Sequence, residues 1–287
     1  MPSAQELVES CDCLVSLPEI YLRVREVVDN PDSSMNDLAK VLALDPAITA
    51  RILQVVNSPL YGLPKKIGTL SQAVGLLGMQ PIQDIVFATS VAKAFPRIEA
   101  SVMDVTAYWR KSVRCGLLAT SLGKLARLED PEGLFVIGLL RDVGHLVMYQ
   151  TVPARAQSAL VEAGHLSQSI AEVEQSNIGC DYTEVGGELL KKWGMPASIE
   201  SAIRHQLTPS EAGEHEGIAG VIGVSGALSD YLENLPADKE VDQDVIQATV
   251  APIRLTLGQA SGAIEAVHSQ LRDVLNLIYP KAMAMAA

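Results

Sequence analysis

The sequence predicts an all-α protein that folds as a two-lobed helical bundle. Apolar residues recur at three- and four-residue spacing along nearly all of the 287-residue chain, which is the period of one helix face. No segment shows a sustained two-residue alternation, so no strand is predicted. Prolines stand where helices would begin, at positions where the missing N–H has no helical partner. The length suits one large domain or two modest ones.

Residues 17–95 are expected to form five short helices with tight joints. Ile20, Val24 and Val27 give the first helix an apolar face, and Asn30-Pro31 ends it. Ser34-x-x-Asp37 resembles a capping box, in which a side chain at each end of the motif binds a free backbone N–H. The expected starts are Pro18, Ser34, Pro46, Thr69 and Pro81, and the fifth helix ends at Phe95-Pro96.

The remaining chain is also expected to be helical. Asp181 is a suitable N-cap, and the small residues Gly220, Gly223 and Ala227 are expected to allow close helix packing. The expected helices span residues 104–127, 134–148, 153–163, 169–177, 182–193 and 197–205, and most of 208–287.

The composition is that of a globular protein, with 48% hydrophobic and 20% charged residues. The net charge of −12 disfavours direct binding to nucleic acid or to an anionic membrane surface, because the long-range field repels both. A local basic patch would still be compatible with this net charge.

The chain is expected to be cytoplasmic. No apolar run approaches the length of a membrane span, and residues 1–6 lack the basic and apolar parts of a signal peptide. The four cysteines, at positions 11, 13, 115 and 180, have no zinc or redox spacing and are expected to be reduced structural thiols. Cys11 and Cys13, near the start of the chain, are the candidates for exceptions.

The order of several motifs resembles the HDOD family, which comprises catalytically degenerate relatives of the HD and HD-GYP metal-dependent phosphohydrolases. The resemblance runs from about Leu17 to Leu207, roughly two thirds of the chain. The motifs of the first half are Leu17-Pro18, Asp45-Pro46-Ala47-Ile48, Val56-Asn57-Ser58 and Ala73-Val74-x-x-Leu77-Gly78. Those of the second half are Trp109-x-x-Ser112, Gly138-Leu139-Leu140-x-Asp142-Val143-Gly144 and Glu184-Val185-Gly186-x-x-Leu189-Leu190-x-x-Trp193-x-x-Pro196.

The resemblance implies an N-terminal helical subdomain over residues 1–100 with five helices and an HD-like helical subdomain over residues 101–210. Residues 211–287 would form a C-terminal helical extension that packs on the HD-like part. The implied role is bacterial signal transduction, as a scaffold or output module whose partners are signalling proteins of the receiver, GGDEF or kinase type. No such module is visible in the sequence, so the chain is expected to be a stand-alone member or a fragment. The sequence defines no oligomeric state.

The motifs depart from the HD pattern where that pattern supplies metal ligands. Lys111 and Arg141 stand where the pattern has His, and neither cation has a lone pair to give a metal. Asp181-Tyr182 replaces an Asp-His step, and His205-Gln206 replaces a His-His pair. Only Asp142 and His205 remain as ligands, below the usual minimum of three. No metal, no other cofactor and no catalytic activity are therefore expected.

Two interpretations of these remnant-site residues stay open. In the first, Arg141 and Lys111 replace the metal by pairing with Asp142, because a buried carboxylate needs a partner. In the second, Lys111, Arg141 and His205 leave a basic pocket that senses a nucleotide or another small anion. A residual phosphohydrolase is the remaining alternative. His145 is expected to be a hydrogen-bonded core residue.

Overall fold

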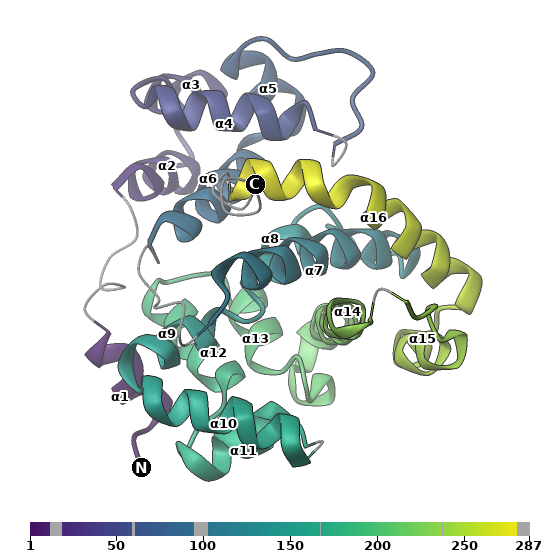
Figure 1. Ribbon diagram of the computed structural model, residues 1–287. Helices are drawn as coiled ribbons and strands as arrows, with labels where there is room; N and C mark the ends of the chain where they lie inside the picture. The colour runs from purple at the N-terminus through teal and green to yellow at the C-terminus, as the bar shows by residue number, and fades with distance from the viewer. Residues whose placement is uncertain (12–18, 59–60, 95–102, 167, 237, 280–287) are drawn as a thin grey trace. The chain divides into compact units, whose positions relative to one another are not determined.

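The computed structural model describes residues 1–11, 19–58, 61–94, 103–166, 168–236 and 238–279, and every regular element in these ranges is a helix. The all-α prediction is confirmed (Figure 1). The chain divides into two compact units. The larger unit is Met1–Ser16 with Arg97–Glu265, and the smaller unit is Leu17–Pro96 with Ala266–Ala287.

The smaller unit contains the five helices expected after residue 17. They are α2 (Glu19–Asp29), α3 (Met35–Ala43), α4 (Pro46–Val56), α5 (Leu70–Leu77) and α6 (Met79–Ala94). Ser34 and Asp37 form the expected capping box, and Asp45 and Thr69 cap the helices that follow them. One boundary was wrong: α6 begins at Met79, because Pro81 lies within the first turn, where no backbone donor is needed. The expected end at Phe95-Pro96 lies outside the described residues.

The larger unit begins with a short helix that the sequence interpretation missed. α1 (Ala4–Ser10) has a capping box between Ser3 and Glu6, the same signal that was used at Ser34. Its residues Leu7 and Val8 are buried. Cys11 follows directly and is a free thiol that is 2% exposed, so this candidate for an exception is a buried residue. Cys13 lies outside the described residues.

The other helices of the larger unit are as follows: α7 (Val105–Leu125), α8 (Leu134–Leu140), α9 (Val143–Thr151), α10 (Pro153–Leu166), α11 (Ile170–Asn177), α12 (Tyr182–Lys192), α13 (Ala197–Arg204), α14 (Glu216–Asn234) and α15 (Gln243–Val250). Helix α16 (Leu257–Ile278) begins here and continues into the residues assigned to the smaller unit.

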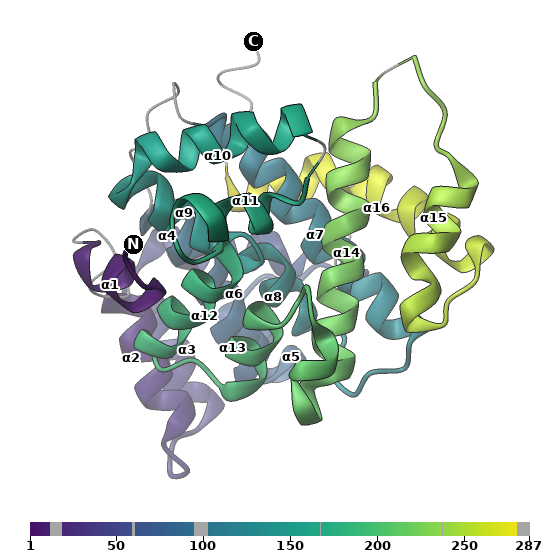
Figure 2. The same ribbon diagram turned by 90° about the horizontal axis from the view of Figure 1, so that it is seen from below.

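Close backbone contacts hold α8 and α9 in the interior of the larger unit. A Cβ on Gly138 of α8 would lie 2.7 Å from the Gly116 Cα of α7. A Cβ on Gly144 of α9 would lie 2.7 Å from the Gly186 backbone nitrogen of α12. Helix α14 crosses α7, which it contacts, and it also contacts α13 (Figures 1 and 2). These glycines let α7 and α12 pack closely against the short α8–α9 segment.

The helix expected over residues 134–148 is broken in two at Arg141 and Asp142. Asp142 occupies the N-cap position of α9 but makes no side-chain capping hydrogen bond. Arg141 and Asp142 are 7% and 2% exposed. The break therefore places a buried guanidinium and a buried carboxylate in the interior of the unit. The Asp142 carboxylate makes no capping hydrogen bond, so it needs partners from other helices.

Candidate functional site

Four charged side chains of the larger unit form an ion-pair cluster, defined here as Lys111, Arg141, Asp142 and Asp230. Lys111 Nζ lies 2.7 Å from Asp142 Oδ2 and 3.1 Å from Asp230 Oδ1. Arg141 Nη2 lies 2.8 Å from Asp230 Oδ2, and Arg141 Nε lies 3.4 Å from Asp142 Oδ1. Each cation thus faces both carboxylates, and the four formal charges sum to zero.

Neutral side chains also contact Arg141, although its buried Nη1 has no hydrogen-bond partner among the described residues. Its Nε donates a hydrogen bond to Gln206 Oε1 (2.9 Å), and its Nη2 donates to the Tyr182 hydroxyl (3.3 Å). Gln206 Nε2 donates in turn to the Arg141 carbonyl at 3.0 Å and to the Ile203 carbonyl at 2.9 Å. The Gln206 amide therefore fixes both the side chain and the backbone of Arg141 at the helix break.

Burial and charge act in opposite directions on the ionisation of the cluster. Burial on its own would raise the pKa of Asp142, but Arg141 and Lys111 outweigh it, so this pKa lies well below its usual range. Burial would lower the pKa of Lys111, but Asp142 and Asp230 raise it above its usual value. Both groups are therefore ionised at neutral pH.

A second buried layer lies beside the cluster, around His145. The imidazole stacks on the Tyr182 ring at 4.2 Å and on the Tyr149 ring at 5.6 Å between centroids. His145 Nε2 lies 2.9 Å from Glu174 Oε1, although the geometry is not that of a hydrogen bond. The other Glu174 oxygen accepts from the Tyr182 backbone N–H at 3.0 Å. His145 is thus a core residue, packed between aromatic rings and a buried carboxylate.

The structure brings together Lys111, Arg141, Asp142, Tyr182 and Gln206, but it places Asp181 and His205 elsewhere. The Asp181 carboxylate accepts from the Thr183 and Glu184 backbone N–H groups, because it caps α12. His205 Nδ1 lies 3.8 Å from Glu211 Oε2. His205 is the C-cap residue of α13, and the chain turns there so that the next residue, Gln206, enters the interior. The inclusion of Asp181 and His205 among the remnant-site residues is corrected accordingly.

Sequence reasoning missed Asp230, which contacts both cations of the cluster. The available signal was a carboxylate near the end of an otherwise small and apolar stretch of α14, but nothing local identifies its partners. It also missed Glu233 on the same helix, which lies 2.8 Å from Arg114 Nη1 and accepts from Arg110 Nε at 2.9 Å. Both carboxylates attach α14 to α7, while Gly223 and Gly226 allow α14 to approach Gln206 and Arg141 closely. A Cβ on Gly223 would overlap Gln206, and one on Gly226 would overlap Arg141. Ala227, which was also expected at a close helix contact, is instead exposed.

The side chains of the cluster differ from those of a metal site. Over the described ranges, no three His, Cys, Asp or Glu side chains lie close enough together to hold one metal ion. The two carboxylates that converge here are each contacted by a lysine and an arginine. These residues therefore do not fit the catalytic metal of an HD phosphohydrolase.

No helix in the described part of the chain has both the length and the apolar character needed to cross a membrane.

The all-helical fold is that of the HD-like phosphohydrolases. A solved structure of a candidate phosphohydrolase from Shewanella amazonensis SB2B matches with a TM-score of 0.78 and 25% identity, over 96% of this chain and 98% of that one. A protein of unknown function with an HDOD domain from Geobacter sulfurreducens matches with a TM-score of 0.73 and 19% identity, over 96% and 97% of the two chains.

The chain belongs to the HDOD family, since the family model described as HDOD domain matches residues 14–209. A curated relative, an uncharacterized protein of Treponema pallidum (strain Nichols), is 20% identical over 250 residues. The match covers 85% of this chain and 47% of the relative, so the chain spans about half the length of that protein.

Proposed function

We propose that this chain is a non-catalytic HDOD module of signal transduction that works by binding other signalling proteins. The observation that carries the proposal is the ion-pair cluster: Lys111 Nζ lies 2.7 Å from Asp142 Oδ2, at the carboxylate that an HD enzyme would give to its metal. A metal activates water by lowering the pKa of the bound molecule. A fixed ammonium group offers no coordination site, and its charge repels a cation.

Names of similar proteins support the signalling part of the proposal. A candidate signal transduction protein from Marinobacter aquaeolei VT8 matches with a TM-score of 0.64 and 23% identity, over 95% of this chain and 60% of that one. The MmoQ response regulator from Methylococcus capsulatus str. Bath matches with a TM-score of 0.50 and 21% identity, over 88% and 98%. These likenesses show a shared fold, and the proposal extends the role to this chain.

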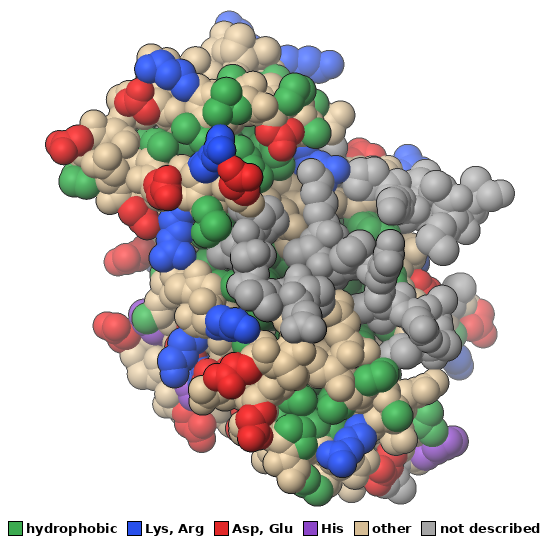
Figure 3. Space-filling model, turned by 90° about the vertical axis from the view of Figure 1, so that its left-hand side faces the viewer, with side chains coloured by type: hydrophobic (Ala, Val, Ile, Leu, Met, Phe, Trp, Pro, Cys, Tyr) green, Lys and Arg blue, Asp and Glu red, His purple; other side chains and the backbone are tan. Residues whose placement is uncertain are grey.

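Surface charge also favours a protein partner over nucleic acid. On the face shown in Figure 3, Lys and Arg side chains are interspersed with Asp and Glu, and the coloured residues form no continuous basic patch. Together with the net charge of −12, this arrangement gives little attraction to a polyanion. The proposed partners are proteins with receiver, GGDEF or kinase modules.

The catalytic part of the proposal is tested by hydrolysis of bis(p-nitrophenyl) phosphate with added Mn²⁺. Wild type and Asp142→Asn are expected to give the same background rate, because no activated water is formed at the cluster. Metal-dependent turnover that disappears in Asp142→Asn would show a phosphohydrolase instead. Asp273→Asn, at an exposed position of α16, is the matched control.

The binding part is tested by affinity capture from extract of the native cell, with quantification against an unrelated acidic protein as bait. Enrichment of a protein that carries a receiver, GGDEF or kinase module is expected. Failure to enrich any such protein above the control bait would contradict the proposal.

The competing sensor hypothesis requires positive charge that is free to bind an anion. In the cluster, two cations face two carboxylates, so an incoming phosphate would compete with Asp142 and Asp230 for the positive charge. Calorimetry with a panel of nucleotides is expected to show no binding. Binding that is lost in Arg141→Ala would favour the sensor.

A further inference from the structure

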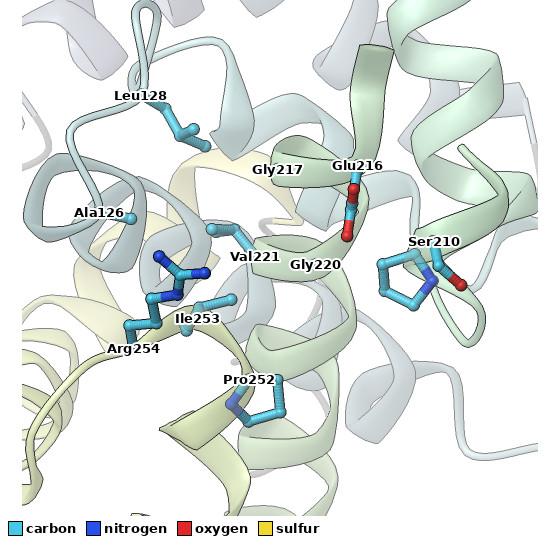
Figure 4. Close-up of a pocket in the computed structure, with 11 residues that line it drawn as sticks. Ala126, Leu128, Ser210, Glu216, Gly217, Gly220, Val221, Pro252, Ile253 and Arg254 are labelled. Atoms are coloured by element: carbon cyan, nitrogen blue, oxygen red, sulfur yellow. The ribbon is translucent and has the colours of Figure 1, made fainter. Parts of the chain in front are cut away.

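A groove in the larger unit lies apart from the ion-pair cluster and has no part in the function proposed above. It encloses about 580 Å³ between the end of α7, the 3-10 turn η2 (Pro209–Glu211), the first turns of α14 and the 3-10 turn η4 (Ala251–Ile253). No residue of the cluster lines it. Pockets that bind small molecules typically enclose about 300–1,000 Å³ and combine an apolar lining with a few polar groups. The groove has this size and this mixture (Figure 4).

The floor of the groove is formed by two glycines of α14 that helix packing does not require. A Cβ on Gly220 would lie 3.6 Å from Ile253 Cγ2, and one on Gly217 would lie 3.4 Å from Leu128 Cδ2, which are ordinary contacts. Alanine would therefore fit at both positions and would favour the helix. Gly223 and Gly226, on the same helix, differ because a Cβ there would overlap a neighbour. Gly217 and Gly220 therefore leave the groove free of side chains at two of its lining positions.

The walls carry an arginine in a backbone conformation that suits glycine. Arg254 has φ 59°, and Arg127, which lies between the lining residues Ala126 and Leu128, has φ 60°. Among the described residues other than glycine, these two alone have positive φ. The left-handed conformation is unfavourable for a residue with a Cβ, and glycine is the usual choice at a helix end. An arginine is an uncommon residue in this conformation, and Arg254 is one of the residues that line the groove.

The charged groups of the groove stand on opposite sides. Figure 4 shows Arg254 on one side of the Gly217–Gly220 stretch and Glu216 with Ser210 on the other. In the part of the chain that the structure describes, neither Arg254 nor Glu216 takes part in an ion pair. The guanidinium is thus available to an anion from solvent, beside the apolar side chains of Val221 and Ile253.

We propose that this groove binds a small apolar organic anion. Its carboxylate or sulfonate pairs with Arg254, because a guanidinium offers two parallel N–H donors to such a group. Its apolar body lies on Leu128, Val221 and Ile253, over the two glycines. Glu216 disfavours ligands with a second negative charge near α14, so the groove selects monoanions.

The test uses two fluorescent probes with the same ring system. 1-Anilinonaphthalene-8-sulfonate is a monoanion, and N-phenyl-1-naphthylamine is its neutral counterpart. Arg254→Gln is expected to weaken binding of the sulfonate about fivefold, the upper range for an exposed ion pair, and to leave the neutral probe unchanged. Glu216→Gln is expected to tighten sulfonate binding about twofold by removing a repulsion. Gly220→Leu fills the groove and should weaken both probes.

Arg155→Gln is the matched control, since Arg155 is exposed on α10 and lines a different pocket. It should change neither probe. Circular dichroism of each variant establishes that the fold is retained. Arg254 and Glu216 are exposed, so their substitution should not affect folding, and these two variants still test the proposal if Gly220→Leu is unstable. The proposal is overturned if Arg254→Gln binds the sulfonate as wild type does, or if Arg254→Gln and Arg155→Gln weaken it equally.

Discussion

Removing one carboxylate from the ion-pair cluster should destabilise the protein by an amount that depends on burial. Asp142→Asn leaves the shape of the side chain and removes its charge, so Lys111 and Arg141 would share only Asp230. The Asp142 side chain is 3% exposed, and breaking a buried pair of this kind costs about 3–5 kcal/mol. The Asp230 side chain is 36% exposed, so water can replace part of its interaction, and Asp230→Asn should cost about 1–2 kcal/mol.

Urea unfolding followed by circular dichroism measures the free energy of unfolding of both variants. Asp273→Asn, an exposed carboxylate on α16, controls for the loss of one negative charge and should stay within about 0.5 kcal/mol of wild type. An Asp142→Asn effect equal to or smaller than that of Asp230→Asn would refute the reasoning, because burial would then not determine the cost.

The other predictions concern packing, pH and a thiol. Gly226→Ala should lower the free energy of unfolding by about 1–3 kcal/mol, because its Cβ would overlap Arg141. Gly220→Ala on the same helix should raise the free energy of unfolding by up to about 1 kcal/mol, because alanine favours the helix and meets no overlap there. Equal effects of the two substitutions in urea unfolding would contradict the packing argument. The pKa of Asp142 is lowered on folding, so the stability that the ionised side chain contributes should be complete above about pH 4 and be lost at lower pH. The difference in free energy of unfolding between wild type and Asp142→Asn, measured in urea, should therefore shrink below that pH. A difference that is independent of pH down to 3 would contradict this. Burial raises the pKa of the Cys115 thiol to about 12, so iodoacetamide at pH 8 should modify it only after unfolding, as mass spectrometry of digests can show.

Local features of the fold could be predicted from sequence because their physical cause is local. Ser34, Asp45 and Thr69 each bind a backbone N–H within three residues, so the residue type and its position next to an apolar run suffice. Pro81 misled for a related reason: proline is tolerated throughout the first turn, so it marks a helix start only to within a turn. The missed α1 carries the same Ser-x-x-Glu signal at Ser3 and could have been found.

Features of the candidate site depended on contacts between distant segments. Arg141 and Asp230 are separated by 89 residues, and no spacing rule connects them. The choice between His205 and Gln206 was decided by where α13 ends, because one residue of offset changes which side chain enters the interior. Asp181 shows a third limit of sequence-based prediction, because the same carboxylate could cap a helix or belong to the site. In the structure it caps α12.

The charge balance of the cluster restricts how this chain can change over generations. Replacing Arg141 by a histidine, the residue of the HD pattern, would leave Lys111 with two carboxylates and a net negative charge around the helix break. Replacing Asp142 or Asp230 first would leave an excess of positive charge instead. Each single replacement creates an uncompensated charge, and the cost is largest at the buried Arg141 and Asp142. A replacement at one of these positions therefore keeps the cluster neutral only when a second substitution, on a different helix, restores the charge balance.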